Sequence, residues 1–102
     1  MKKAKVYVDD ILAGMLVETD EGFYTFSYFK DYKGDDVSLT LRKRDKQYTS
    51  KVLFPFFDGL IPEGWLLDKI VKNWKLNIND RMELLLTCCK DCIGNVRIER
   101  DE

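Results

Sequence analysis

The chain has 102 residues, of which 45% are hydrophobic and 34% are charged. A chain of this length and composition is expected to fold as one domain, residues 1–102, and to bury roughly 65% of the surface that its unfolded form exposes. Its formal net charge of -1 excludes the strongly basic surface that is typical of nucleic-acid-binding proteins.

The N-terminal residues predict a cytoplasmic protein. Residues 1–5 are basic, as in a signal peptide, but the apolar run that follows covers only residues 6–8 before two aspartates. No stretch is long and apolar enough to cross a bilayer, so no membrane contact is expected. The three cysteines, an odd number, favour a reducing compartment over a disulfide framework.

The first half of the chain is expected to form a sheet. Four segments rich in β-branched and aromatic residues predict strands, namely residues 6–8, 11–19, 23–28 and 37–41. Large apolar side chains alternate with smaller polar ones along these segments, so one face of the sheet should be apolar and require a cover.

Residues 42–46, Arg-Lys-Arg-Asp-Lys, are the one concentrated basic run of the sequence. Such a run is typical of a phosphate or nucleic-acid contact, and equally of a solvated loop that joins a strand to a helix. The loop is the simpler interpretation, and whether Arg42 to Lys46 also contacts a partner stays open.

Residues 54–65, FPFFDGLIPEGW, hold both prolines together with three phenylalanines and a tryptophan. Pro55 suits the first turn of a short helix, because it lacks an N–H and fixes its own φ angle. Pro62, Glu63 and Gly64 predict a tight corner, with the acidic residue at the positive end of the next helix. Two helices should therefore meet at a rigid, partly apolar corner.

The second half predicts helices and a final strand. Over residues 65–75, one stripe at helical spacing is expected to cover the sheet: Leu66, Leu67, Ile70, Val71 and Trp74. Asn79 is the expected N-cap of a further helix, with Asp80 in its first turn, and residues 96–100 should return to the sheet. The predicted fold class is α+β, a small antiparallel sheet of about four to five strands covered by about three helices.

The sequence lacks the residues and motifs that are typical of an enzyme active site. It contains no histidine, the commonest general base, and no phosphate-binding or kinase catalytic-loop motif. Cys88, Cys89 and Cys92 form a CCxxC motif that fits a redox pair, half a zinc site or an ordinary core cysteine with two incidental neighbours. Three thiols leave a structural zinc site one ligand short. Because catalytic motifs are also missing, we expect no enzyme, no metal and no cofactor.

Trp65 is the strongest candidate for a partner contact. At about 100° per residue it lies nearly opposite the apolar stripe, and Lys69 and Lys72 flank it. A large aromatic beside a rigid corner is typical of a binding anchor, although it also fits a side chain folded back over the preceding phenylalanines. The predicted partner-binding residues are Ile61, Pro62, Glu63, Gly64, Trp65, Lys69 and Lys72.

The pattern Phe-Phe-x-x-Leu-(Ile/Leu)-Pro-Glu-Gly in residues 56–64 resembles the N-terminal module of HipA-type serine/threonine kinases, the toxins of a bacterial toxin–antitoxin family. The likeness extends over nearly the whole chain, including residues 23–28, 38–41 and 91–96. Arg42 and Lys43 depart from the family's usual Pro-Leu at these positions. The family's long members continue into a kinase core, so this sequence resembles the module alone.

This resemblance implies a split system similar to the HipBST arrangement, in which a HipS antitoxin is encoded apart from a shortened HipT-type kinase toxin. The chain would then be an antitoxin that neutralises the kinase, without direct nucleic-acid contact. A second hypothesis is a scaffold that completes the kinase fold or bridges it to a HipB-like helix-turn-helix DNA-binding protein. A third, a small redox or metal protein, depends on the CCxxC motif alone.

Overall fold

The computed structural model describes residues 2–38, 40–45, 47–61, 64–75, 77, 80–88 and 95–101. The strands in this part of the chain are β1 (Lys2–Val8), β2 (Ile11–Glu18), β3 (Tyr24–Tyr28), β4 (Gln47–Ser50) and β5 (Val96–Arg100). The α-helices are α1 (Pro55–Asp58), α2 (Gly64–Trp74) and α3 (Arg81–Cys88), and η1 (Lys43–Asp45) is a short 3-10 helix.

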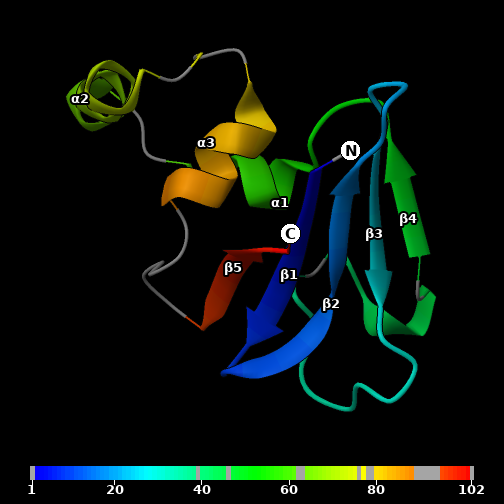
Figure 1. Ribbon diagram of the computed structural model, residues 1–102. Coiled ribbons are helices and arrows are strands. Elements are labelled where there is room, and N and C mark those ends of the chain that lie inside the picture. The colour runs from blue at the N-terminus through cyan, green and yellow to red at the C-terminus, as the bar shows by residue number, and fades with distance from the viewer. Residues whose placement is uncertain are drawn as a thin grey trace.

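The five strands form one antiparallel sheet in the order β4-β3-β2-β1-β5. The first three strands form a meander, and β5 returns from the C-terminal end of the chain to pair with β1 (Figure 1). The α+β fold class is therefore confirmed, as a five-stranded antiparallel sheet with three helices.

The fourth strand lies later in the chain than predicted. The described residues of this segment, 37, 38, 40 and 41, form no strand but only an isolated bridge between Ser38 and Leu41, and β4 pairs with β3 in their place. The predicted strand at 37–41 is wrong, and the basic run that follows it leads into β4 and not into a helix.

The buried apolar residues that made residues 37–41 look like a strand are held in the core by hydrogen bonds to Tyr28. The Val37 and Leu41 side chains are both buried, but a loop holds them in the core. The Tyr28 hydroxyl accepts a hydrogen bond from the Val37 N–H at 2.8 Å and donates one to the Leu41 carbonyl. Burial raises the pKa of Tyr28 to about 12, so the hydroxyl keeps its proton and can donate.

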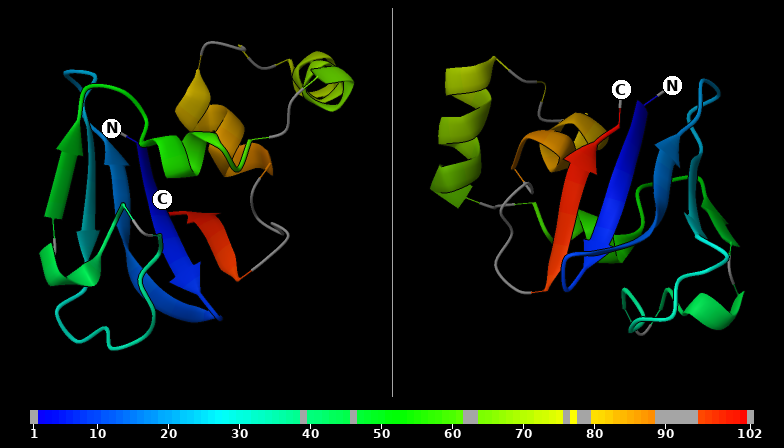
Figure 2. Two further views of the ribbon diagram at one scale, coloured as in Figure 1. Left: turned by 180° about the vertical axis from the view of Figure 1, so that it is seen from behind. Right: turned by 60° about the horizontal axis from the view of Figure 1, so that its bottom comes forward.

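Helices α1 and α3 cover the apolar face of the sheet, and both lie on the same side of it (Figure 2). Phe57 of α1 is fully buried there, and its ring centroid lies 5.5 Å from that of Phe26 on β3. Phe54 and Phe56 surround the same ring, with centroids 6.2 Å and 5.3 Å away. On α3, the side chains of Met82, Leu85 and Leu86 are buried.

Contrary to the prediction, helix α2 does not cover the sheet. Figures 1 and 2 show it apart from the sheet, on the far side of α3. Ile70 and Val71 are only partly buried, and Val71 packs against the core. The side chains of the other three stripe residues, Leu66, Leu67 and Trp74, lie outside the described part of the structure. The apolar face that this stripe was expected to cover is already occupied by α1 and α3.

A cluster of charged side chains fixes the first turn of α3 to both ends of the chain. The Lys2 ammonium lies 2.7 Å from the Asp80 carboxylate, and the Arg100 guanidinium lies 2.5 Å from the Glu83 carboxylate. Asp80 immediately precedes α3 and accepts the Glu83 N–H at 3.2 Å, so it caps the helix and does not lie in its first turn as predicted. Asn79, the predicted cap, lies outside the described residues.

Replacing Phe57 with alanine should destabilise the fold by about 3–5 kcal/mol, because it removes a fully buried ring at the contact between α1 and the sheet. Urea unfolding measures the loss. Phe23→Ala is the control, since this ring is 41% exposed and should cost less than about 1 kcal/mol. Equal losses for the two variants would contradict the placement of Phe57 in the core.

Acid should weaken the attachment of α3. The hydrogen bond from Arg100 lowers the pKa of Glu83. For Asp80, partial burial raises the pKa, but the hydrogen bonds from Lys2 and from the Glu83 N–H outweigh it, so the pKa is lowered. A carboxyl whose pKa is lowered by folding adds stability above its ordinary pKa, and this stability is lost as the pH falls through the lowered value. The melting temperature of the protein should therefore decrease when the pH is lowered past about 4.

Glu83→Gln should lower the melting temperature at pH 7 and make its decrease between pH 7 and pH 3 smaller, because one of the two carboxylates is gone. Glu21→Gln, in an exposed turn, is the matched control and should follow the parent at every pH. Parallel melting curves for the parent and Glu83→Gln would show that the charged cluster does not stabilise α3.

Candidate functional site

The corner that follows α1 is held from inside. Ile61 is 3% exposed and belongs to the core cluster, so this member of the predicted partner-binding set supports the corner and does not form its outer surface. Backbone hydrogen bonds continue the turn, from the Leu60 N–H to the Phe57 carbonyl at 3.0 Å and from the Ile61 N–H to the Asp58 carbonyl at 3.2 Å. Pro62 and Glu63 lie outside the described residues.

An ion pair joins α1 to α3 beside this corner. The Arg81 Nε atom lies 2.6 Å from Asp58 Oδ1. Both side chains are partly exposed, so the pair fixes the relative position of the two helices more than it adds stability. The chain segment that carries α2 therefore leaves and re-enters the protein at two fixed points, α1 and α3.

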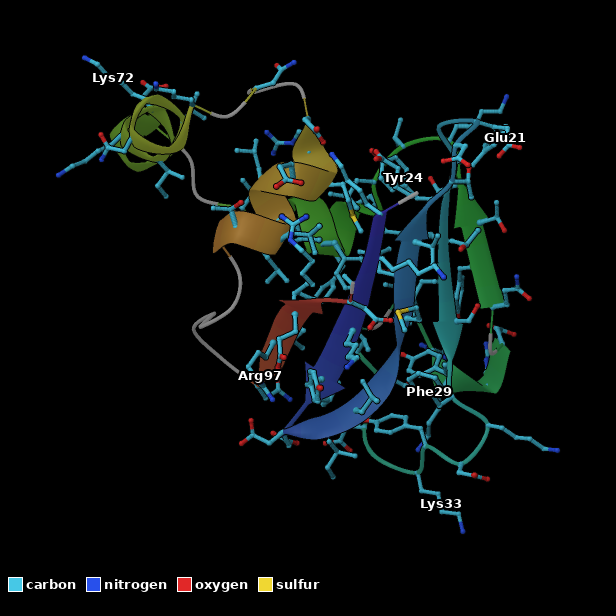
Figure 3. All side chains as sticks on the ribbon, in the orientation of Figure 1. Glu21, Tyr24, Phe29, Lys33, Lys72 and Arg97 are labelled. Carbon is cyan, nitrogen blue, oxygen red and sulfur yellow. The ribbon has the colours of Figure 1, made fainter. Side chains whose placement is uncertain are left out.

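Helix α2 carries the rest of the predicted set. Gly64 begins the helix, and the Trp65 side chain lies outside the described part of the structure. Lys69 and Lys72 are exposed and lie one turn apart, and Lys72 extends away from the body of the protein (Figure 3). The structure thus brings Gly64, Lys69 and Lys72 onto one helix, separated from Ile61 by the corner.

The basic run forms a separate surface at η1. Arg42, Lys43 and Arg44 are exposed and, with Asp36, line an open hollow of about 360 Å³. The Lys43 ammonium donates a hydrogen bond to the Gly34 carbonyl at 2.5 Å, and the backbone N–H of Lys43 donates one to the Asp36 carboxylate at 2.9 Å. These bonds hold Lys43 in a folded loop, and the exposed side chains of the run leave a partner contact untested. Lys46 lies outside the described residues.

The described residues contain no candidate metal site. Among these residues no group of three or more histidine, cysteine, aspartate or glutamate side chains is arranged to hold a metal ion. The CCxxC motif is not tested, because the Cys88 side chain, Cys89 and Cys92 all lie outside the description. Within the same ranges, none of the helices has the length and apolar character needed to span a membrane.

Comparisons with known proteins converge on one family. The family model described as HipA N-terminal domain matches residues 4–99. An uncharacterized protein of Haemophilus influenzae strain Rd is 32% identical over 102 residues, which is 100% of this chain and 95% of that protein. The solved N-terminal domain of HipA toxin superimposes with a TM-score of 0.80 at 30% identity, covering 100% of this chain and 94% of that one.

The end of α2 offers a test of how independent this helix is. Lys75 follows the helix with a φ of 54°, a left-handed conformation that costs a residue other than glycine about 1 kcal/mol. Lys75→Gly should therefore stabilise α2. Because α2 lies apart from the sheet, we expect about fivefold slower hydrogen exchange of its amides without a change in melting temperature.

Asp10→Gly is the matched comparison, since Asp10 has a φ of 65° in the turn between β1 and β2. There the same relief should raise the melting temperature of the whole protein, because the turn belongs to the sheet. A rise in melting temperature of equal size for Lys75→Gly would mean that α2 unfolds together with the sheet.

Proposed function

Because the chain belongs to the HipA N-terminal domain family, we propose that it is an antitoxin that binds and neutralises a shortened HipA-like serine/threonine kinase toxin. The observation that carries this proposal is the family match over residues 4–99, which covers the N-terminal domain and not the catalytic domain. Residues 1–102 would act as one non-catalytic domain that occupies the kinase where the fused module sits in longer members of the family.

The proposed contact surface is the corner together with the polar side of α2. It consists of Pro62, Glu63, Gly64, Trp65, Lys69 and Lys72, with Ile61 supporting the corner from the core. Two findings support this choice: Lys69 and Lys72 are exposed, and α2 stands clear of the sheet where a partner can reach it. Trp65 would be the anchor, because a rigid aromatic loses little conformational entropy on binding.

A second observation favours the scaffold alternative. The face of the sheet opposite α1 and α3 has no helix of the described part over it, and it presents partly exposed Tyr7, Met15 and Val17. A chain with contact surfaces on two sides can bridge the kinase to a HipB-like helix-turn-helix protein without inhibiting it. The two functions differ in what happens to kinase activity within the complex.

The proposal is tested first by looking for a reading frame of a short HipA-like kinase beside this gene, and then by mixing that kinase with the chain. Both functions require a stable complex at micromolar concentration, with a buried surface on the order of 1,600 Å². Only the antitoxin function also requires that co-expression restores the growth of cells that produce the kinase. Binding without growth rescue would favour the scaffold, and failure to co-elute would contradict both.

Trp65→Ala should leave the melting temperature nearly unchanged, weaken kinase binding by at least about 2 kcal/mol, or roughly thirtyfold, and abolish growth rescue. Calorimetric titration and thermal melts measure these effects. If Trp65 instead folds back over the preceding phenylalanines, the same change should destabilise the fold by about 3 kcal/mol. A variant that melts far earlier, or that binds and protects like the parent, would rule out the anchor.

A further inference from the structure

The basic run at η1 concentrates positive charge on a chain that is otherwise acidic. Residues 42–46 hold four basic residues and one acidic residue, a net charge of +3. Because the formal net charge of the whole chain is -1, the remaining residues carry -4. The described members of the run, Arg42 to Asp45, are all exposed. They precede β4, at the opposite end of the molecule from α2 and outside the proposed kinase contact (Figure 1).

Hydrogen bonds fix the loop that carries this run. The Tyr28 hydroxyl binds the backbone at Val37 and at Leu41. The Tyr48 hydroxyl donates to the Arg42 carbonyl at 2.8 Å. Neighbouring basic side chains are therefore presented from a backbone that is already held in place. A rigid support of this kind is typical of binding sites, because less conformational entropy is lost when a ligand binds.

Lys43 is anchored without being neutralised. Its ammonium donates to the carbonyls of Gly34 at 2.5 Å and Lys33 at 3.4 Å, and both acceptors are uncharged. The positive charge of Lys43 is therefore held in a fixed position. Arg44 is only weakly compensated, since its Nε atom lies 3.8 Å from the Asp45 carboxylate and the two side chains are 73% and 59% exposed. Water screens an ion pair as exposed as this one.

The hollow beside this run has the charge and size to receive a doubly charged anion. Its volume is about 360 Å³, within the range of small-ligand sites, and the described residues that line it are Arg42, Lys43, Arg44 and Asp36. Three cations and one carboxylate give this lining a net charge of +2. A phosphate monoester on a side chain carries about -1.5 to -2 at pH 7. Guanidinium groups also match the oxygens of a phosphate through paired hydrogen bonds.

We propose that this hollow binds a phosphate monoester, namely a phosphoserine or phosphothreonine side chain of a partner protein. The choice of a phosphorylated side chain rests on the proposed function, because a serine/threonine kinase transfers phosphate to these two residue types. The hollow has room beside a phosphate for the residue that carries it. A nucleic acid fits less well, since a polyanion would also pass over a protein whose remaining residues carry -4 and repel it.

The test probe is a capped tripeptide with phosphoserine between two alanines, titrated at low salt and followed through the amide NMR signals of the isotope-labelled full chain. Signals of residues 40–45 should shift, with a dissociation constant of about 1 mM or lower, and the peptide with unmodified serine should not bind. Arg42→Gln with Arg44→Gln should weaken binding at least tenfold. The matched control is Lys3→Gln with Lys51→Gln, which removes the same charge from exposed positions on β1 and beyond the other end of β4. The control should change the affinity less than twofold.

Asp36→Asn is a second arm with the opposite sign. Asparagine keeps an oxygen that can accept the Lys43 N–H but removes the negative charge from the hollow, so the phosphopeptide should bind at least threefold more tightly. Thermal melts check that each variant folds like the parent, and if the double arginine variant does not, Asp36→Asn decides alone. An affinity that is unchanged by Asp36→Asn, or lowered equally by the arginine and lysine pairs, would overturn the site.

Two further titrations distinguish the sources of the phosphate. Inorganic phosphate should bind more weakly than the phosphopeptide; equal or tighter binding would assign the hollow to the free anion and overturn the side-chain source. A short oligothymidylate that binds more tightly than the phosphopeptide would assign the hollow to nucleic acid. None of these measurements uses the kinase, so their failure leaves the antitoxin or scaffold function standing. Failure of the chain to co-elute with the kinase contradicts the proposed function and not the phosphate site.

Discussion

The position of the candidate site depends on the contact between Phe57 and the sheet. Helix α1 spans only Pro55–Asp58, too short to be stable through its own hydrogen bonds, so tertiary packing must hold it. Phe57 provides that packing by burying its ring against Phe26. Ile61, four residues later, is buried in the same core, so the chain is fixed on both sides of the turn. The direction in which it leaves toward α2 is therefore set by the core.

The other end of α2 is fixed by different forces. Lys2 and Arg100, from opposite ends of the chain, hold the first turn of α3 through Asp80 and Glu83. These side chains are half-buried, so their ion pairs orient the helix, while the buried leucines of α3 supply most of the stabilisation. Helix α2 thus lies between an aromatic attachment and an ionic one, and among its described side chains Val71 packs against the core.

Local patterns in the sequence predicted the first three strands, the three helices and the last strand, because these depend on alternation, helical spacing and the chemistry of Pro55. It missed β4, since Gln47–Ser50 is short and polar and gains its place by pairing with β3. It also misplaced a strand at 37–41, because burial through the Tyr28 hydroxyl is a tertiary effect. For the site, helical spacing separated Lys69 and Lys72 from the apolar stripe, but spacing does not reveal which surface covers that stripe. Spacing also did not reveal that Ile61 is buried, since its burial depends on the core packed around α1.

A partly covered α2 has a thermodynamic consequence for the chain's function. Apolar surface left in water forgoes about 25 cal/mol of stabilisation for each Å² that a partner can bury. Under the proposed function, a kinase that covered α2 would bury this surface and add the stability of binding to that of the free chain. Under the antitoxin proposal this links the stability of the chain to the presence of its target, because a helix that a partner covers opens less often than a free one. A scaffold that only completed the kinase fold would gain the same stability, so this linkage would not by itself distinguish an antitoxin from a scaffold.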